Sequence, residues 1–152
     1  LLLVCTGGGA GIVWIYVRLK ERGKTETASA DRIHPAGRAL SSIQKIEEQR
    51  MWEYRQKAYY FEMSMIIKHY LSARMSINIE DMTSAEIEKI LKKKLETDMA
   101  IQWTELLKSM DWVKYSTFVA GPNEAKGLIQ RSRSLILKQE QLYTSDTKEN
   151  NV

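Results

Sequence analysis

The stretch that decides the fold is YYFEMSMIIKHYL, residues 59–71. Its apolar side chains recur every three or four residues and therefore share one face of an α-helix; they are Tyr59, Met63, Ile66, Ile67, Tyr70 and Leu71. The sequence SINI at residues 76–79 favours a turn or extended chain, so we expect the helix to end near Met75. One long helix with a wide apolar stripe thus forms the centre of the predicted fold.

Working outward from this helix, four other segments show the same period. One follows Pro35, a residue that suits the start of a helix, and it has Ala39, Leu40, Ile43 and Ile46 on its apolar face. The others cover residues 84–94, 98–110 and 122–138. No segment alternates with period two for long enough to predict a strand. We therefore predict an all-α domain of about five helices in a compact bundle over residues 35–138, with a disordered tail at 139–152.

Local signals mark some helix ends and leave others open. Thr83 and Glu86 have the spacing of a capping box, in which each side chain bonds the other residue's backbone N–H. Residues 48–52 are compatible with either a turn or a continuous helix. The expected core includes three of the tryptophans, Trp52, Trp103 and Trp112.

The first seventeen residues, LLLVCTGGGAGIVWIYV, carry no charge, and basic residues follow at once. A helix of this length spans about 25 Å, slightly less than a hydrocarbon core. We interpret residues 1–17 as a transmembrane helix truncated at its start, because a signal peptide would carry its basic residues before the apolar run. Trp14, Tyr16, Arg18, Lys20 and Arg22 would lie at the membrane interface.

The positive-inside rule then predicts a single-pass membrane protein with residues 18–152 in the cytoplasm. Residues 18–34 are polar and basic and resemble a flexible linker. Gly7 and Gly11 form a GxxxG spacing that could bring two spans together.

Composition and motifs give little support to catalysis. The chain has 23 basic and 19 acidic residues, one cysteine and two histidines, too few for a disulfide or a cysteine metal site. No known catalytic or nucleotide-binding motif is present, and Glu62 and His69 are better interpreted as surface residues than as an acid–base pair. We expect no enzyme activity, cofactor, metal or nucleic-acid partner.

Two pieces, YYFEMSMIIKHYLSARMSI at 59–77 and EDMTSAEI at 80–87, carry a family resemblance. They resemble the cytoplasmic helical domain that follows one transmembrane helix in BatD-like proteins of the Bat (Bacteroides aerotolerance) operons. The positions that match are Tyr59, Tyr60, Tyr70, Leu71, Met75, Met82, Thr83, Ser84, Glu86, Asp111, Val113, Lys114, Tyr115 and Pro122. The resemblance implies a non-enzymatic component of the bacterial inner membrane. Such proteins are encoded beside a MoxR-type AAA+ ATPase, von Willebrand A-domain proteins and tetratricopeptide-repeat proteins.

The leading hypothesis is therefore a protein–protein docking module within a MoxR ATPase and von Willebrand A-domain system. Lys92, Lys93, Lys94, Asp111 and Lys114 are the candidate contact residues. Asp111, Val113, Lys114 and Tyr115 follow a helix end, and two interpretations of them stay open. Either they form an exposed recognition turn, or Val113 and Tyr115 anchor the turn to the core and Asp111 is a helix-end or cap residue. The alternative function is a self-assembling structural component of the envelope that forms homo-oligomers through Gly7 and Gly11.

Overall fold

The computed structural model describes residues 34–149. Within this range it contains α3 (Pro35–Gln49), a 3-10 turn η1 (Met51–Glu53), α4 (Gln56–Met75), α5 (Ser84–Lys94), α6 (Thr97–Tyr115) and α7 (Pro122–Glu149), and no strand. The predicted all-α class is confirmed.

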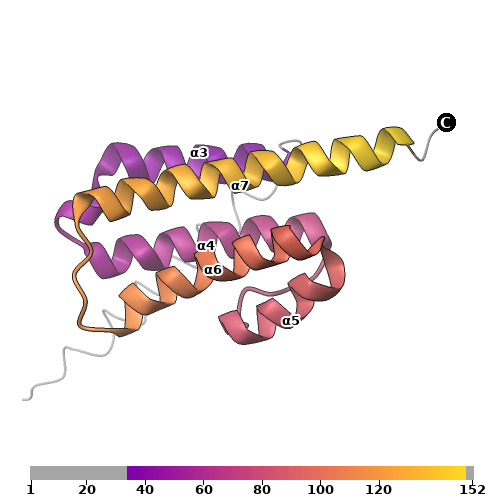
Figure 1. Ribbon diagram of the computed structural model, residues 1–152. Coiled ribbons are helices and arrows are strands. Elements are labelled where there is room, and N and C mark those ends of the chain that lie inside the picture. Colours follow the sequence, from indigo (N-terminus) through magenta and orange to yellow (C-terminus); the bar gives the residue numbers. More distant parts are fainter. Residues whose placement is uncertain (1–33, 150–152) are drawn as a thin grey trace, which may run out of the picture. The chain divides into compact units, whose positions relative to one another are not determined.

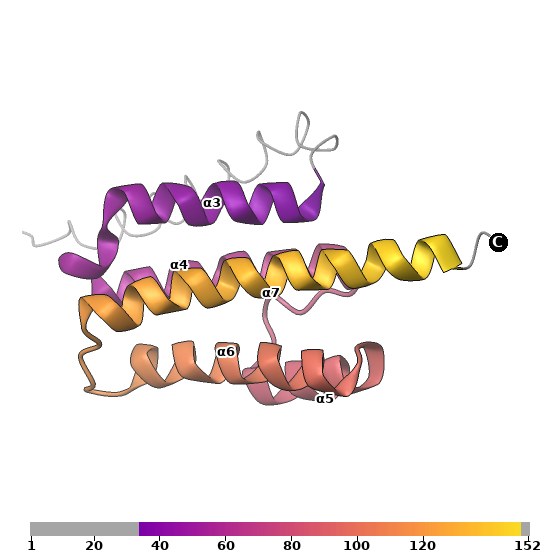
Figure 2. The same ribbon diagram turned by 45° about the horizontal axis from the view of Figure 1, so that its top comes forward.

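The four long helices pack in a ring, each against two others, in the order α3, α4, α6, α7 (Figure 1). The short helix α5 lies outside the ring and packs against α6, as Figure 2 shows from a second direction. The ring encloses one core, in which the largest side chains with almost no exposure are Trp103, Tyr59, Tyr70, Ile43, Met63 and Ile67. Burial of each such side chain contributes about 1.5–3 kcal/mol, which makes this core the main source of stability.

The corner between α3 and α4 is a turn and not a continuous helix. Arg50 adopts the left-handed conformation (φ 49°), and its N–H donates to the carbonyl of Glu47 at 3.1 Å. The chain then makes one 3-10 turn, which buries Trp52. Of the two possibilities that the sequence left open at residues 48–52, the structure thus has the turn.

Two sequence-predicted ends of helices agree with the structure. Helix α4 ends at Met75, and the capping box of α5 is complete. The Glu86 N–H donates to Thr83 Oγ1 at 3.3 Å, and the Thr83 N–H donates to Glu86 Oε2 at 2.8 Å. The capping box is confirmed because it depends only on local spacing.

We expect Ser76→Gly to stabilise the protein by about 0.5–1 kcal/mol. Ser76 closes α4 in the left-handed conformation (φ 55°), with its N–H bonded to the carbonyl of Ser72. Glycine adopts this conformation without the steric cost that Cβ imposes. Urea unfolding measures the change, and Ala73→Gly, inside the same helix and exposed, is the control with an expected loss of about 1 kcal/mol. Equal losses in the two variants would contradict the prediction.

Helix α7 continues to Glu149, where the sequence pattern predicted a disordered tail from residue 139. Leu142 of this extension packs against the core, and polar contacts hold the beginning of the extension. Gln139 Oε1 accepts a hydrogen bond from Trp103 Nε1 at 3.1 Å, and Glu140 Oε1 accepts one from the Tyr70 hydroxyl at 2.8 Å. Arg74 pairs with the other oxygen of Glu140 at 3.2 Å.

Trp112 lies outside the core, contrary to the sequence prediction, because 66% of its surface is exposed. The buried stripe of α6 passes through Met99, Trp103 and Met110. Trp112 comes two residues after Met110 and therefore points about 200° away from it around the helix. The remaining two predicted core tryptophans, Trp52 and Trp103, are buried.

The predicted location in the bacterial inner membrane needs correction. Among the helices of residues 34–149, none combines the length and the apolar character required to cross a bilayer. Their apolar side chains occupy the buried stripes, and charged side chains occupy the other faces, which is the pattern of bundle helices. This finding contradicts the single-pass localisation, which we do not retain.

Several earlier predictions fall on residues that the structure does not describe. The predicted span at 1–17 lies outside the described range, and so does the predicted linker at 18–34 except for its last residue, His34. The same holds for the interface residues and the glycine pair, which are Trp14, Tyr16, Arg18, Lys20, Arg22, Gly7 and Gly11.

Candidate docking surface

Helix α6 ends, and α4 begins, at the same end of the bundle (Figure 1). Large apolar side chains of these two helices and of the loop after α6 are exposed. We call this group the end patch; it consists of Phe61, Tyr115, Phe118 and Val119. Tyr115 and Val119 are 81% and 78% exposed, and Phe61 is 53% exposed. The end patch joins two segments that are distant in sequence: α4, and the last turn of α6 with the loop that follows it.

Polar contacts from the first turn of α4 fix the loop that carries Phe118 and Val119. The Gln56 side chain bonds both backbone groups of Ala120, accepting from its N–H at 3.2 Å and donating to its carbonyl. Lys57 Nζ donates to the carbonyls of Val113 and Ser116. Because the last carbonyls of a helix lack partners within the helix, Lys57 acts as a cap for α6.

Lys114 lies beneath the end patch, between two of its rings. Its ammonium group is 5.9 Å from the centroid of Phe61 and 5.2 Å from that of Tyr115, distances at which a cation attracts an aromatic face. Only 8% of the Lys114 side chain is exposed, and it pairs with Asp111 at 2.7 Å. The same Asp111 accepts a hydrogen bond from Ser84, the first residue of α5.

The sequence-predicted contact residues therefore fall into two groups. Asp111 and Lys114 lie in the last turns of α6, which extends to Tyr115 and not only to residue 110, and their charged groups point into a network between α4, α5 and α6. Lys92, Lys93 and Lys94 are exposed at the end of α5. The structure does not bring the two groups together.

Glu88 on α5 pairs with two lysines, one of which connects α5 to α6. Its carboxylate oxygens lie 2.7 Å from Lys108 Nζ on α6 and 2.7 Å from Lys92 Nζ on its own helix. Ser84 comes before Glu88 on α5, whereas its partner Asp111 comes after Lys108 on α6. The two helices are antiparallel, and this register places Lys92 beside the turn of α6 that contains Ile101 and Glu105.

We expect the carboxyl of Glu88 to titrate near pH 2. Hydrogen bonds from Lys108 and then Lys92 lower its pKa from 4.5 to about 2. A lowered pKa in the folded state favours folding above pH 4.5, and this contribution disappears as the pH falls from 4.5 towards 2. NMR titration of the side-chain carboxyl measures the midpoint. Lys108→Gln should raise it towards 4.5 and Lys45→Gln should not; a midpoint near 4.5 in the unaltered chain would refute the expectation.

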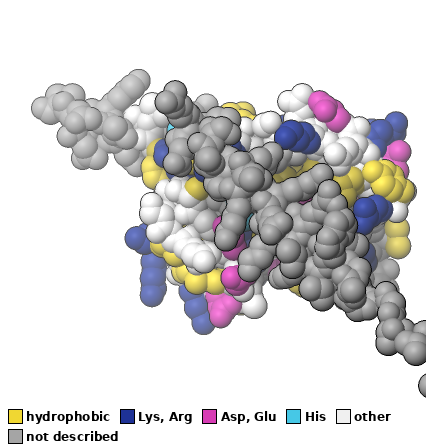
Figure 3. Space-filling view, turned by 180° about the vertical axis from the view of Figure 1, so that it is seen from behind, with side chains coloured by type: hydrophobic (Ala, Val, Ile, Leu, Met, Phe, Trp, Pro, Cys, Tyr) yellow, Lys and Arg dark blue, Asp and Glu magenta, His cyan; other side chains and the backbone are white. Residues whose placement is uncertain are grey.

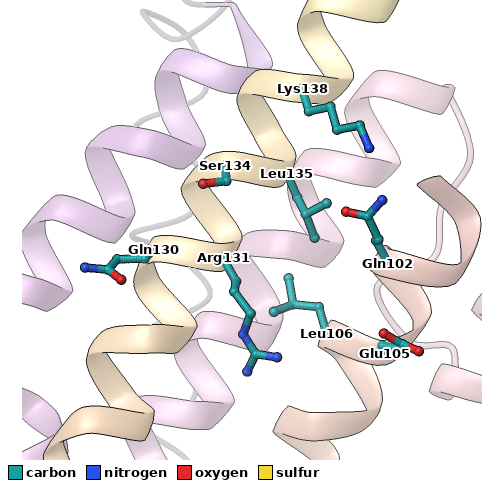
Figure 4. A pocket seen from close by; sticks show the side chains of 8 residues that line it. All are labelled: Gln102, Glu105, Leu106, Gln130, Arg131, Ser134, Leu135 and Lys138. Atoms are coloured by element: carbon teal, nitrogen blue, oxygen red, sulfur yellow. The ribbon is translucent and has the colours of Figure 1, made fainter. Parts of the chain in front are cut away.

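A shallow groove between α6 and α7 is the second candidate site, with a volume of about 280 Å³. Figure 4 shows Leu106 and Leu135 pointing into the space between the two helices, with polar side chains around them. On its rim, Lys138 pairs with Asp98 at 2.9 Å. The rim includes both Arg131 and Glu105, so its charge does not favour one class of ligand over another.

The acid–base candidates considered in the sequence lie at the surface of the described residues. His69 Nδ1 lies 2.7 Å from Glu80, both side chains are more than one third exposed, and Glu62 is exposed on the same helix as His69. Residues 34–149 contain no group of three or more His, Cys, Asp or Glu side chains that could hold a metal ion. Where Figure 3 shows described residues, basic, acidic and apolar side chains are interspersed.

Sequence reasoning missed most of the end patch. Phe61 is off the apolar stripe of its helix by position, and this signal was available in the sequence. Phe118 and Val119 belong to a loop with no period, so only the contacts of Gln56 and Lys57 bring them beside Phe61.

Comparison with known proteins gives no further guide: the chain matches no family model, no curated protein and no solved structure. The resemblance to BatD-like proteins therefore has no support beyond the residues that carry it.

Proposed function

We propose that the helical domain of residues 35–149 is a non-enzymatic protein–protein docking module and that the end patch is its contact surface. The observation that carries this proposal is the exposure of Phe61, Tyr115, Phe118 and Val119 at one end of the bundle. Single exposed apolar residues are ordinary in soluble domains, but a contiguous group is typical of binding surfaces. Aromatic side chains are enriched at protein–protein interfaces, and tyrosine is among the residue types that contribute most to binding energy.

The end patch is held in place before any partner binds. Lys57 and Gln56 fix the loop that follows α6, and Lys114 holds its position between the rings of Phe61 and Tyr115. A surface that is already ordered loses less conformational entropy on binding, and more of the contact energy then appears as affinity. Asp111 and Lys114 support the surface from below in this proposal, whereas Lys93 and Lys94 are free to contact an acidic region of the partner.

The partner that we propose is the MoxR-type AAA+ ATPase, or a von Willebrand A-domain protein, of the same system. This choice rests on the resemblance of residues 59–77 and 80–87 to the BatD-like helical domain. The end patch supplies the apolar surface that such a contact needs.

Photo-crosslinking in cells tests the proposal on the full chain. A photo-reactive amino acid replaces Tyr115 or Val119 in turn, and mass spectrometry identifies the captured protein. Leu137, on α7 and 51% exposed, is the control position. We expect capture of the ATPase or of a von Willebrand A-domain protein from positions 115 and 119, and none from 137.

A second variant separates binding from damage to the fold. Phe118→Ser removes a 46% exposed ring from the loop and should leave the helical content unchanged, yet reduce affinity for the purified partner by about tenfold or more. Equal capture from all three positions, or unchanged affinity of this variant, would contradict the proposal.

A further inference from the structure

The outward face of α6 carries four residues at a symmetric spacing, with an apolar residue at each end and two charged residues between them. Ile101, Glu105, Lys108 and Trp112 are separated by four, three and four residues, so they share one face and the spacing is the same from either end. We call these four residues the α6 stripe. All are exposed, including 45% of Ile101 and 66% of Trp112. Apolar residues stand at both ends of the stripe, and opposite charges stand in the middle.

The two charges in the middle of the stripe are incompletely paired within the chain. Glu105 forms no ion pair with another residue in the described part of the chain. Lys108 shares the carboxylate of Glu88 with Lys92, so two ammonium groups have one partner. The stripe therefore presents one acidic and one basic position that can each accept a further partner of opposite charge.

We propose that the α6 stripe is the interface of a homodimer in which two α6 helices pack antiparallel about a twofold axis. In this arrangement Ile101 of each chain faces Trp112 of the other, and Glu105 faces Lys108. Each contact occurs twice because a twofold interface uses the same surface on both chains. The occupant of the stripe is thus a second copy of this chain, whose stripe supplies the complementary charges.

The order of the charges selects the antiparallel arrangement. In a parallel pair, Glu105 would face Glu105 and Lys108 would face Lys108, and like charges at these positions repel. Two helices approach to about 8–10 Å between their axes, which lets a tryptophan ring cover an isoleucine on the opposite helix. The buried face of α6, with Met99, Trp103 and Met110, lies on the opposite side of the helix from the stripe. The exposure of Ile101 and Trp112 shows that no described helix covers the two ends of the stripe.

This inference does not depend on the proposed docking function, because the α6 stripe and the end patch have no residue in common. Loss of the dimer would leave the end patch intact, and loss of partner binding through Phe118→Ser would leave the dimer intact.

Analytical ultracentrifugation of the full 152-residue chain tests the dimer with two charge variants. We expect the unaltered chain to sediment with twice its mass of 17.6 kDa at micromolar concentration. Glu105→Lys and Lys108→Glu should each raise the dimer dissociation constant at least tenfold, since like charges then meet twice. An equimolar mixture of the two variants should form a heterodimer, and the double variant Glu105→Lys/Lys108→Glu should regain its dimer.

Further variants distinguish an effect on folding from an effect on dimer formation. Glu105→Lys is the cleaner charge variant because Lys108 also bonds Glu88 within the chain. Trp112→Ala should weaken the dimer without any change of charge, and Leu137→Ala, also an exposed apolar residue, should not. Circular dichroism should show equal helical content in all these variants.

Three results would overturn the inference. The first is an unaltered chain that stays monomeric at about 100 µM, a dissociation constant too weak for a specific dimer. The second is a dimer that both charge variants leave unchanged, because the interface would then lie elsewhere. The third is a double variant that stays monomeric, because the antiparallel register would then be wrong.

Discussion

Trp103→Ala should lower the free energy of unfolding by about 3–5 kcal/mol, which is the range for removing a large aromatic side chain from a packed core. Trp103 has no exposed surface, and its ring lies 5.8 Å from that of Tyr70, centroid to centroid. Its Nε1–H donates to Gln139 Oε1, so the substitution leaves both a cavity and an acceptor without its donor. Urea unfolding of the full chain measures the loss.

Trp112→Ala is the matched control, since it removes the same side chain from the same helix. With 66% of its surface exposed, Trp112 should contribute less than about 0.5 kcal/mol when the chain is monomeric. The measurement therefore uses a protein concentration low enough to prevent association. Similar losses from the two variants would mean that the assignment of the buried face of α6 is wrong.

Asp111→Ala should cost about 3 kcal/mol, the lower end of the range for breaking a buried ion pair, because the Asp111 side chain keeps 29% exposure. The substitution leaves the ammonium of Lys114, whose side chain is 8% exposed, with Ser64 as its remaining polar contact at 3.3 Å. It also removes the acceptor of the Ser84 hydroxyl at the start of α5. Lys68 is close enough to add repulsion: burial and then Lys114 lower the pKa of Lys68.

The double variant Asp111→Ala/Lys114→Met identifies the cause of this loss. If an unpaired ammonium is responsible, replacing it with an apolar side chain of similar length should restore at least half of the lost stability. Lys114→Met alone should cost about 1 kcal/mol, because Asp111 keeps Ser84 and water as partners. Additive losses in the double variant would show that the two residues act independently.

The sequence was sufficient to predict the elements with strong local signals. The stripe at residues 59–71 identified α4, and the spacing of Thr83 and Glu86 identified the start of α5. These features depend on residues within one turn of each other, so no tertiary information was needed. The all-α class follows from the same local periods.

Other features depended on contacts between distant segments. The end of α7 is helical because Gln139 and Glu140 meet Trp103 and Tyr70, and residues 139–149 alone show no apolar period. For the same reason, the helix predicted at residues 98–110 was too short. The last turn of α6 extends to Tyr115, where Lys57 from α4 bonds its terminal carbonyls.

The candidate docking surface shows most clearly which features depend on local sequence and which depend on tertiary packing. The sequence alone determined where the five helices lie, which faces of them are apolar and that a capping box begins α5, because these depend on spacings of three to four residues. Only the tertiary structure decided that Asp111 and Lys114 point inward and that Phe61, Tyr115 and Phe118 come together at one surface. The physical reason is that burial depends on which helix packs against each face, and no local pattern contains that information.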